Sequence, residues 1–203
     1  MPIDYILPIK FYRVGNTSFT DRQVEEMVAR TNRKLTNVGI KIEIESISHI
    51  NSISKAYISL KSKQNELKEL LLQYGYQGAT KDKFLRVFLV KLDIDEYLGS
   101  WSYDPDPNPE YQAAIFITEL FNDNSDEAYE AQLYRKENDS LLHELGHTLM
   151  WESSHIGGVA ANFFHELAEL TDDSITPQQS LRLRGEDPGR PADAPNYLRS
   201  VLT

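Results

Sequence analysis

The segment HELGH holds two histidines four residues apart and a glutamate directly after the first: His143, Glu144 and His147. On a helix, residues four apart share one face about one turn from each other, so both rings can offer a nitrogen to one cation. Zn²⁺ binds imidazole nitrogen at about 2.0–2.1 Å. Glu144 lies next around the helix, where its carboxylate can take the proton of a water molecule that the ion activates. This pattern predicts metal-assisted hydrolysis of a peptide bond, with the two histidines as ligands and Glu144 as general base.

The residues around HELGH indicate the helix that this geometry needs. The stretch LLHELGHTLMW, residues 141–151, places leucines at helical spacing on the side away from the two histidines. These leucines are Leu141, Leu142, Leu145 and Leu149. The competing interpretation is a pair of histidines packed in a core without a metal. A HExxH segment in a helical context is rare by chance, so we expect one catalytic zinc ion here.

The third ligand is less clearly marked. A catalytic zinc usually has three protein ligands and one open position. His155 is the nearest candidate, in WESSHIGG, where serines and glycines predict that the chain turns back. Glu166, in the helix-like segment FFHELAEL, is the rival, and Glu169 is a further alternative. We expect His155 to complete the ligand set, with Glu166 or Glu169 as the other candidates.

The elements that must position this site can be read from periodicity and turn chemistry. Strands are predicted at 3–14, 39–47, 84–94 and 113–120, and helices at 20–39, 59–75, 141–151, 160–171 and 176–185. Residues 96–112, with three prolines, predict a loop, and the polar stretch 122–139 is either an acidic loop or an early helix. The tail after 185 is rich in proline and is expected to be irregular. The order predicts an α+β fold, a mixed twisted sheet backed by helices with a small, mostly helical or irregular C-terminal part.

Two helix starts and one strand carry more specific signals. Thr20 with Gln23, and Thr176 with Gln179, each form the pattern of a capping box. The first helix places its apolar side at Val24, Met27, Val28, Thr31 and Leu35. Pro8 inside the first strand predicts an irregularity or an edge position. His49, near a strand end, is expected to be structural or exposed.

The composition narrows the class of protein. The chain has 203 residues, 40% of them hydrophobic, no cysteine and a formal net charge of −10. We expect one domain over 1–203, with residues 1–150 holding the sheet and the HELGH helix and 151–203 a small C-terminal subdomain. The absence of cysteine excludes disulfides and thiolate zinc ligands. The acidic surface argues against nucleic acid as a partner.

The sequence also bears on localisation. MPIDYILPIKFYRV has no apolar run behind a basic patch, and no stretch approaches the roughly 18 apolar residues of a membrane span. We expect a soluble chain, either cytoplasmic or exported without a classical signal. The compartment and the oligomeric state are not fixed by these features.

HELGHTL on a helix resembles the active-site helix of zinc metallopeptidases of the zincin class. Together with TDRQVEEMVARTNRKL, GIKIEI, GSWSYDP, AAIFITEL and TPQQSLRLRG, it makes the chain most similar to metzincins, with compact pappalysin-like members nearest. The resemblance implies a zinc endopeptidase whose protein or peptide substrate binds in extended form. It implies that strand 113–120 is the upper edge of the cleft, although an ordinary buried strand is the alternative. It also offers Tyr197 as a group that polarises the substrate carbonyl, against the simpler interpretation of a surface tyrosine.

The chain departs from the metzincin pattern after HELGH. Metzincins continue with xxGxxH, whereas Met150 and Ser153 stand at the glycine and histidine positions here. His155 fits only if the turn holds two extra residues. No methionine follows Met150 to form the family's methionine turn, so Phe163 or Phe164 would fill that floor. A gluzincin-type peptidase with Glu166 as third ligand is the runner-up resemblance.

Three functions are compatible with these residues. The first is an active zinc peptidase, and the second is a catalytically inactive binding module that keeps the fold. The third is a zinc site that only stabilises the fold, which would need a fourth protein ligand such as Glu166 beside His155. We rank the peptidase first, because HELGH supplies both a metal pair and a base.

Overall fold

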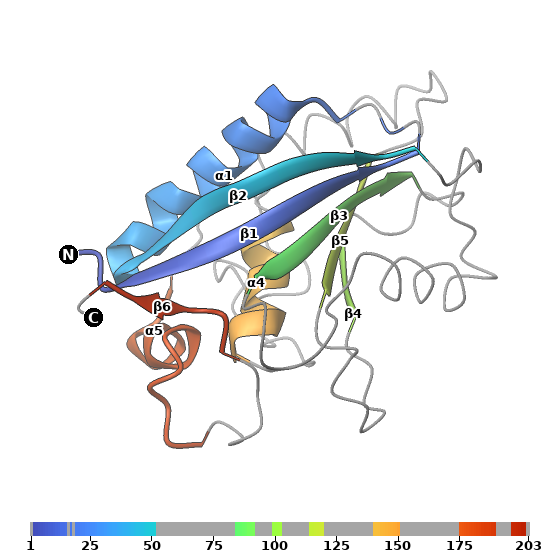
Figure 1. Cartoon of the computed structure of the whole chain (residues 1–203). Coiled ribbons are helices and arrows are strands. Elements are labelled where there is room, and N and C mark those ends of the chain that lie inside the picture. Colours follow the sequence, from blue (N-terminus) through green and yellow to red (C-terminus); the bar gives the residue numbers. More distant parts are fainter. Residues whose placement is uncertain are drawn as a thin grey trace, which may run out of the picture.

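The computed structural model describes residues 2–15, 17, 19–51, 84–91, 99–102, 114–119, 140–150, 175–189 and 196–201. In these residues a mixed six-stranded sheet is backed by helices, which confirms the predicted α+β class (Figure 1). The strands are β1 (Tyr5–Val14), β2 (Ile40–Ile50), β3 (Leu85–Lys91), β4 (Gly99–Ser102), β5 (Ala114–Glu119) and β6 (Arg199–Ser200). The helices are α1 (Asp21–Leu35), the 3₁₀ turn η1 (Thr36–Val38), α4 (Ser140–Met150) and α5 (Pro177–Leu183).

The sheet runs in the order β2-β1-β3-β5-β4, and β6 pairs with β1. The pairings β2–β1, β1–β3 and β3–β5 are parallel. The pairings β5–β4 and β1–β6 are antiparallel. Parallel neighbours need crossover connections, and α1 provides the one between β1 and β2. The parallel part is therefore built from strands far apart in the chain.

Helix α1 forms as its sequence predicts. The Thr20 side chain accepts from the Gln23 backbone N–H, and the Gln23 side chain accepts from the Thr20 N–H, so the capping box is present. All five residues predicted for its apolar side are buried. Asn32 holds the helix to the sheet, because its side-chain amide donates to the Ile42 carbonyl at 3.1 Å and its oxygen accepts from the Ile42 N–H at 2.7 Å. Gly39 ends this unit with φ of 77°, a left-handed conformation that glycine adopts without a Cβ penalty.

β1 is a central strand despite its proline. The ladder to β6 ends at Ile6 and the ladder to β3 begins at Ile9, so Pro8 lies between the two partners on that side. The pairing with β2 shifts register between Ile9 and Lys10. The predicted irregularity is therefore confirmed, and the edge position is wrong. A proline can sit in a central strand where no ladder bond is required of its missing N–H.

The structure corrects one prediction of irregular chain and adds a two-residue strand to a second irregular segment. Residues 99–102, inside the predicted loop, form β4 and pair with β5 from Gly99↔Ile117 to Ser102↔Ala114. The prolines that suggested a loop begin at Pro105, after the strand has ended. In the tail, β6 pairs with Tyr5 and Ile6 of β1, and Val201 donates its N–H to the Asp4 carbonyl at 2.9 Å.

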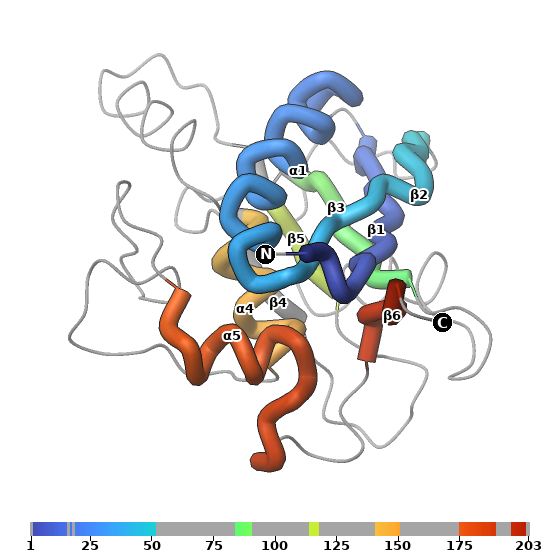
Figure 2. Tube along the Cα trace, turned by 90° about the vertical axis from the view of Figure 1, so that its left-hand side faces the viewer, coloured from blue at the N-terminus to red at the C-terminus, as the bar shows by residue number. Residues whose placement is uncertain are grey.

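The core lies between the sheet and the helices. Figure 2 shows α1 and α4 on the same side of the sheet. Alternate residues of the strands point to this side, among them Leu7, Ile9 and Phe11 of β1 and Val87 of β3, and all are buried. Leu183 of α5 and Leu198, next to β6, belong to the same core. The described C-terminal residues thus pack with the N-terminal ones, while a subdivision at residue 150 stays a prediction.

The other face of the sheet carries an aromatic row across three strands. Tyr12 stacks on Phe88, and Phe88 stacks on Phe116, each pair with ring centroids 5.2 Å apart. These residues are also paired in the ladders from β1 to β3 and from β3 to β5. Stacking of paired side chains reinforces one register, because a slip of one residue would send each ring to the opposite face. The row therefore helps to fix β5 and, through it, β4.

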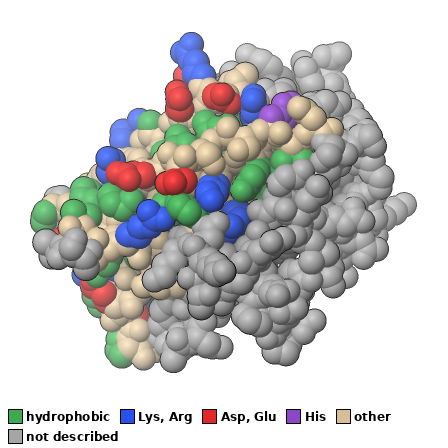
Figure 3. Space-filling view, viewed as in Figure 1, with side chains coloured by type: hydrophobic (Ala, Val, Ile, Leu, Met, Phe, Trp, Pro, Cys, Tyr) green, Lys and Arg blue, Asp and Glu red, His purple; other side chains and the backbone are tan. Residues whose placement is uncertain are grey.

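Several features fall outside the described residues, namely the predicted helices 59–75 and 160–171 and the polar stretch 122–139. Among the parts that are described, no helix is long and apolar enough to cross a membrane. Figure 3 shows acidic and basic side chains interspersed over β1 and β2 on the face in view. Lys41 and Glu43 of β2, 3.6 Å apart, are one such pair.

Candidate metal centre

Helix α4 presents HELGH on a firmly packed base. All four leucines predicted as its apolar anchors are at most 1% exposed and belong to the core. The helix packs against α1, α5, β4 and β5. This burial fixes the rotation of α4, because turning it would bring leucines into water at a cost of about 1.5–3 kcal/mol each. The rotation that buries the leucines determines where His143 and His147 lie.

The two histidines of α4 are close neighbours. Their ring centroids are 5.1 Å apart and their ring planes are inclined by 77°. His147 is 7% exposed, and His143 is half-buried. Two imidazoles that bind one Zn²⁺ at about 2.0–2.1 Å, at roughly the tetrahedral angle, place their ring centres about 5 Å apart. The pair therefore fits a shared zinc ion.

Glu144 is buried beside this pair, with 6% of its surface exposed. A carboxylate is among the side chains least often buried, because its charge loses the stabilisation of water. The following turn is supported by Thr148, whose hydroxyl donates to the Glu144 carbonyl at 3.1 Å. A buried carboxylate next to two histidines can accept a proton inside the site, and this is the chemistry that a general base requires.

The proposed third ligands are not tested by the structure. His155, Glu166 and Glu169 all lie outside the described residues, as do Phe163 and Phe164. Within the described ranges, no group of three or more histidine, aspartate or glutamate side chains is placed to hold one metal ion. His143 and His147 therefore lie side by side on α4, and both their role as ligands and the identity of the third ligand stay predictions.

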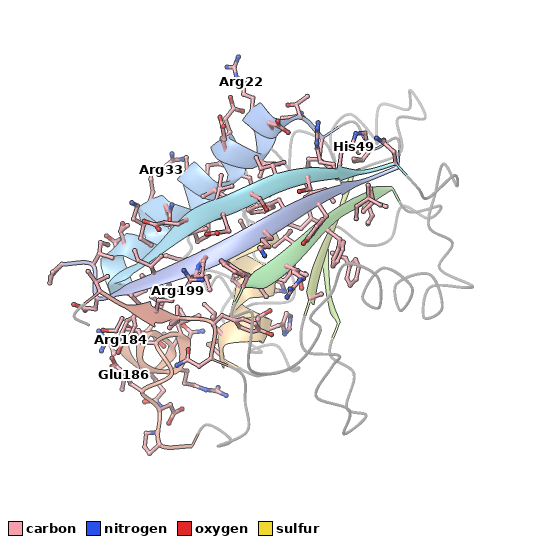
Figure 4. The ribbon with its side chains drawn as sticks, in the orientation of Figure 1. Arg22, Arg33, His49, Arg184, Glu186 and Arg199 are labelled. Carbon is pink, nitrogen blue, oxygen red and sulfur yellow. The ribbon has the colours of Figure 1, made fainter. Side chains whose placement is uncertain are left out.

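The structure also places His49 and Tyr197, two residues whose positions the sequence left open. His49 is exposed at the end of β2, where its Nε2 lies 2.6 Å from the Gly15 carbonyl oxygen, far from α4 (Figure 4). This confirms the expectation of a structural or exposed residue. Tyr197 is only 5% exposed and belongs to the core, so the expectation of a surface tyrosine is wrong.

The edge of the sheet near α4 is β4 and not β5. β5 pairs with β3 on one side and with β4 on the other, so the expectation that strand 113–120 forms the cleft edge is wrong. β4 stands at the end of the strand order and packs against α4. Residues 99–102 lie within the loop expected over 96–112, so a strand outside 113–120 was not anticipated.

A contact between α4 and α5 was not anticipated. The guanidinium of Arg182 donates from Nη2 to the Met150 carbonyl, at the last residue of α4, with a distance of 3.5 Å. Arg182 lies in the last turn of α5, where basic residues are common, so its presence there does not indicate a contact with a second helix. Nothing in the local sequence identifies a partner on another helix.

Comparison with known proteins gives a structural likeness only. No protein-family model matches the chain, and no curated protein matches it in sequence. Among solved structures, the fold is similar to metalloproteinase-II from Bacteroides fragilis, with a TM-score of 0.52 and 16% sequence identity. The match covers 91% of this chain and 54% of that one, so this chain spans about half the length of its structural neighbour. At 16% identity this likeness shows similarity of fold to a protein named a metalloproteinase, and no more.

Proposed function

We propose that this chain is a zinc-dependent peptidase of the zincin class, in which His143 and His147 hold the ion and Glu144 is the general base. The observation that carries the proposal is the spacing of the two imidazoles, 5.1 Å between ring centroids, on a helix whose apolar side is buried. The structural neighbour named a metalloproteinase supports the coarser part of this proposal, a metal-dependent peptidase. His155 is proposed as the third ligand, which makes the chain a metzincin-like member with an altered turn after HELGH.

A bound zinc ion supplies Lewis-acid activation of water and of the scissile carbonyl. The protein's own part begins with His143 and His147, which present ring nitrogens from one face of α4. A carboxylate oxygen of Glu144 accepts the proton from the attacking water and then returns it to the leaving amine. Burial of Glu144 keeps this transfer away from bulk water, where competing solvation would weaken it.

The proposed substrate is a protein or peptide bound in an extended form. β4 stands at the end of the order of the described strands, which supports this edge as the place where an extended peptide would add as a further strand. Because β4 packs against α4, a peptide along this edge would pass beside the HELGH helix. Backbone hydrogen bonds of such pairing give affinity with little sequence selectivity.

The direct test of the mechanism is Glu144→Gln, which keeps the size of the side chain and removes its basicity. We expect zinc content to be unchanged and kcat on a peptide substrate to fall by roughly 10²–10⁴-fold. Glu43→Gln, at an exposed position of β2, is the matched control and should behave as wild type. Wild-type turnover by a zinc-loaded Glu144→Gln protein would contradict the assigned base.

The third ligand can be decided by a matched pair of variants. His155→Ala should lower zinc content strongly, whereas Glu166→Ala should leave it unchanged. The reverse result would favour the gluzincin-type arrangement with Glu166. If both variants lose zinc, both side chains are ligands and the open position is closed, as in a structural site. Full zinc loading of the wild type without cleavage of a broad peptide library would favour the inactive binding module.

A further inference from the structure

The C-terminal end of α4 is held by a residue from a distant part of the chain. α4 ends at Met150, and the last carbonyls of a helix have no partner within it. Arg182 of α5 donates from Nη2 to the Met150 carbonyl at 3.5 Å. Its positive charge also lies at the end of α4 where the helix dipole is negative. The views in Figures 1 and 2 agree in placing α5 beside α4.

Arg182 is itself held in place by an ion pair with Asp187. Its Nε lies 3.4 Å from Oδ2 of Asp187, whose side chain is 15% exposed. Asp187 in turn accepts from the Gly189 N–H at 3.0 Å and from the Gln178 side-chain amide at 3.4 Å. The guanidinium is thus oriented by a carboxylate that is oriented by two donors. A planar guanidinium can bridge two acceptors in this way, which a lysine ammonium does less specifically.

We propose that Arg182 is a positioning residue for the metal centre. It fixes the end of α4 against α5, three residues after the proposed ligand His147. The contact therefore restrains the last turn of α4, which begins at His147. This inference rests on the proposed function, because it assigns Arg182 a role only if α4 binds a metal.

A purely structural role for Arg182 predicts something different. A contact that only stabilises the fold lowers the melting temperature of the metal-free and the zinc-loaded protein equally. A contact that positions the ligands also weakens zinc binding, so it reduces the rise in melting temperature that zinc produces. The zinc affinity of the folded protein therefore separates the two roles without any measurement of activity.

The matched control is Arg184, two residues further along. Its guanidinium pairs with Glu186 and lies 3.8 Å from Asp4, so it ties the end of α5 to the start of β1 (Figure 4). Arg184→Gln removes the same charge from the same end of α5 without removing a described contact to α4. It should lower stability and leave zinc affinity within about twofold of wild type.

The experiment measures the zinc Kd by competition with a chelator, well below the melting temperature, together with melting curves with and without zinc. For Arg182→Gln we expect a Kd about three- to tenfold weaker, less than the ten- to hundredfold loss seen when a direct partner of a ligand is removed. Asp187→Asn should weaken zinc in the same direction and less, since it acts through Arg182. Wild-type zinc affinity in Arg182→Gln, or an equal loss in Arg184→Gln, would overturn the proposal.

Two further variants keep the outcome decisive. If Arg182→Gln fails to fold, Arg182→Lys and Asp187→Asn decide the question, and wild-type zinc affinity in both overturns the proposal. His147→Ala tests the proposed function separately. If the wild type binds zinc no better than His147→Ala does, the metal site itself is wrong. If the wild type binds zinc and Arg182→Gln binds it equally well, only the positioning role is wrong.

Discussion

Helices α1 and α4 cover the same side of the sheet, but they differ in the kinds of side chain that they bury. α1 buries an apolar side, keeps its charged residues on the surface and begins with a capping box. α4 is buried nearly all round, and it carries Glu144 and His147 into the buried part. The fold alone explains every buried residue of α1. α4 differs because a carboxylate and an imidazole are among its buried side chains, and such polar groups are seldom placed inside a protein by packing alone.

Both helices also bury one threonine, and the two threonines are bonded in the same way. Thr31 of α1 and Thr148 of α4 are both fully buried, and each donates its hydroxyl to the carbonyl four residues earlier at 3.1 Å. Such bonding is a local way for a threonine to satisfy its hydroxyl inside a helix. Thr148 is therefore accounted for by the fold, and the functional argument rests on His143, Glu144 and His147 alone.

The first prediction tests whether the two helices are equal in packing. Leu145→Ala in α4 and Leu35→Ala in α1 should each lower the free energy of unfolding by about 2–5 kcal/mol, because both side chains are fully buried. Denaturant titration of the metal-free proteins measures this. A loss below about 1 kcal/mol for Leu145→Ala alone would show that α4 is loosely packed and would weaken the argument that its rotation is fixed.

The second prediction sharpens the contrast at a helix start. Thr20→Ala removes the side chain that accepts from the Gln23 N–H, and it should cost about 1 kcal/mol of stability. Because α1 has no part in the metal site, the rise in melting temperature on adding zinc should equal that of wild type. A smaller rise would indicate that α1 contributes to the site.

The smallest expected effect concerns Tyr5 at the start of β1. Its hydroxyl donates to Glu186 at 2.9 Å, and this hydrogen bond, followed by burial, raises the pKa of Tyr5 above 10.0. A raised folded-state pKa stabilises the protein below pH 10.0, and this contribution is lost as the pH rises through the folded-state value.

The stability difference between wild type and Tyr5→Phe should therefore be constant from neutral pH to about pH 9 and shrink above pH 10. Denaturant midpoints across this range measure it, with and without zinc. The difference should not depend on zinc, because the contact belongs to the part of the molecule that the fold explains. A difference that grows above pH 10 would contradict the assigned shift.

The sequence predicted those parts of the structure that depend on local chemistry. The capping boxes, the buried side of α1 and the anchors of α4 all follow from residues within a few positions of each other. β4 could not be predicted this way, because a four-residue strand is defined by its partner β5 and not by its own composition. The central position of β1 was missed for a related reason, since the effect of Pro8 depends on which strands lie beside it.

In the candidate site too, the features set by local sequence were predicted and the contacts between distant residues were not. The pair His143 and His147, with Glu144 between them, follows from helical spacing, and the structure places the two rings as that spacing predicts. The contact between Arg182 and Met150 joins residues 32 positions apart and has no local signature. Tyr197 was expected at the surface, yet the pairing of β6 with β1 carries the neighbouring residues into the core.

The most direct test of the account is the zinc content of the folded protein after loading and dialysis. The wild type and His49→Ala, which changes an exposed histidine far from α4, should each retain one zinc per chain, and His147→Ala should retain none. Retention by His147→Ala, or failure of the wild type to hold zinc, would contradict the claim that the two histidines of α4 form a metal site.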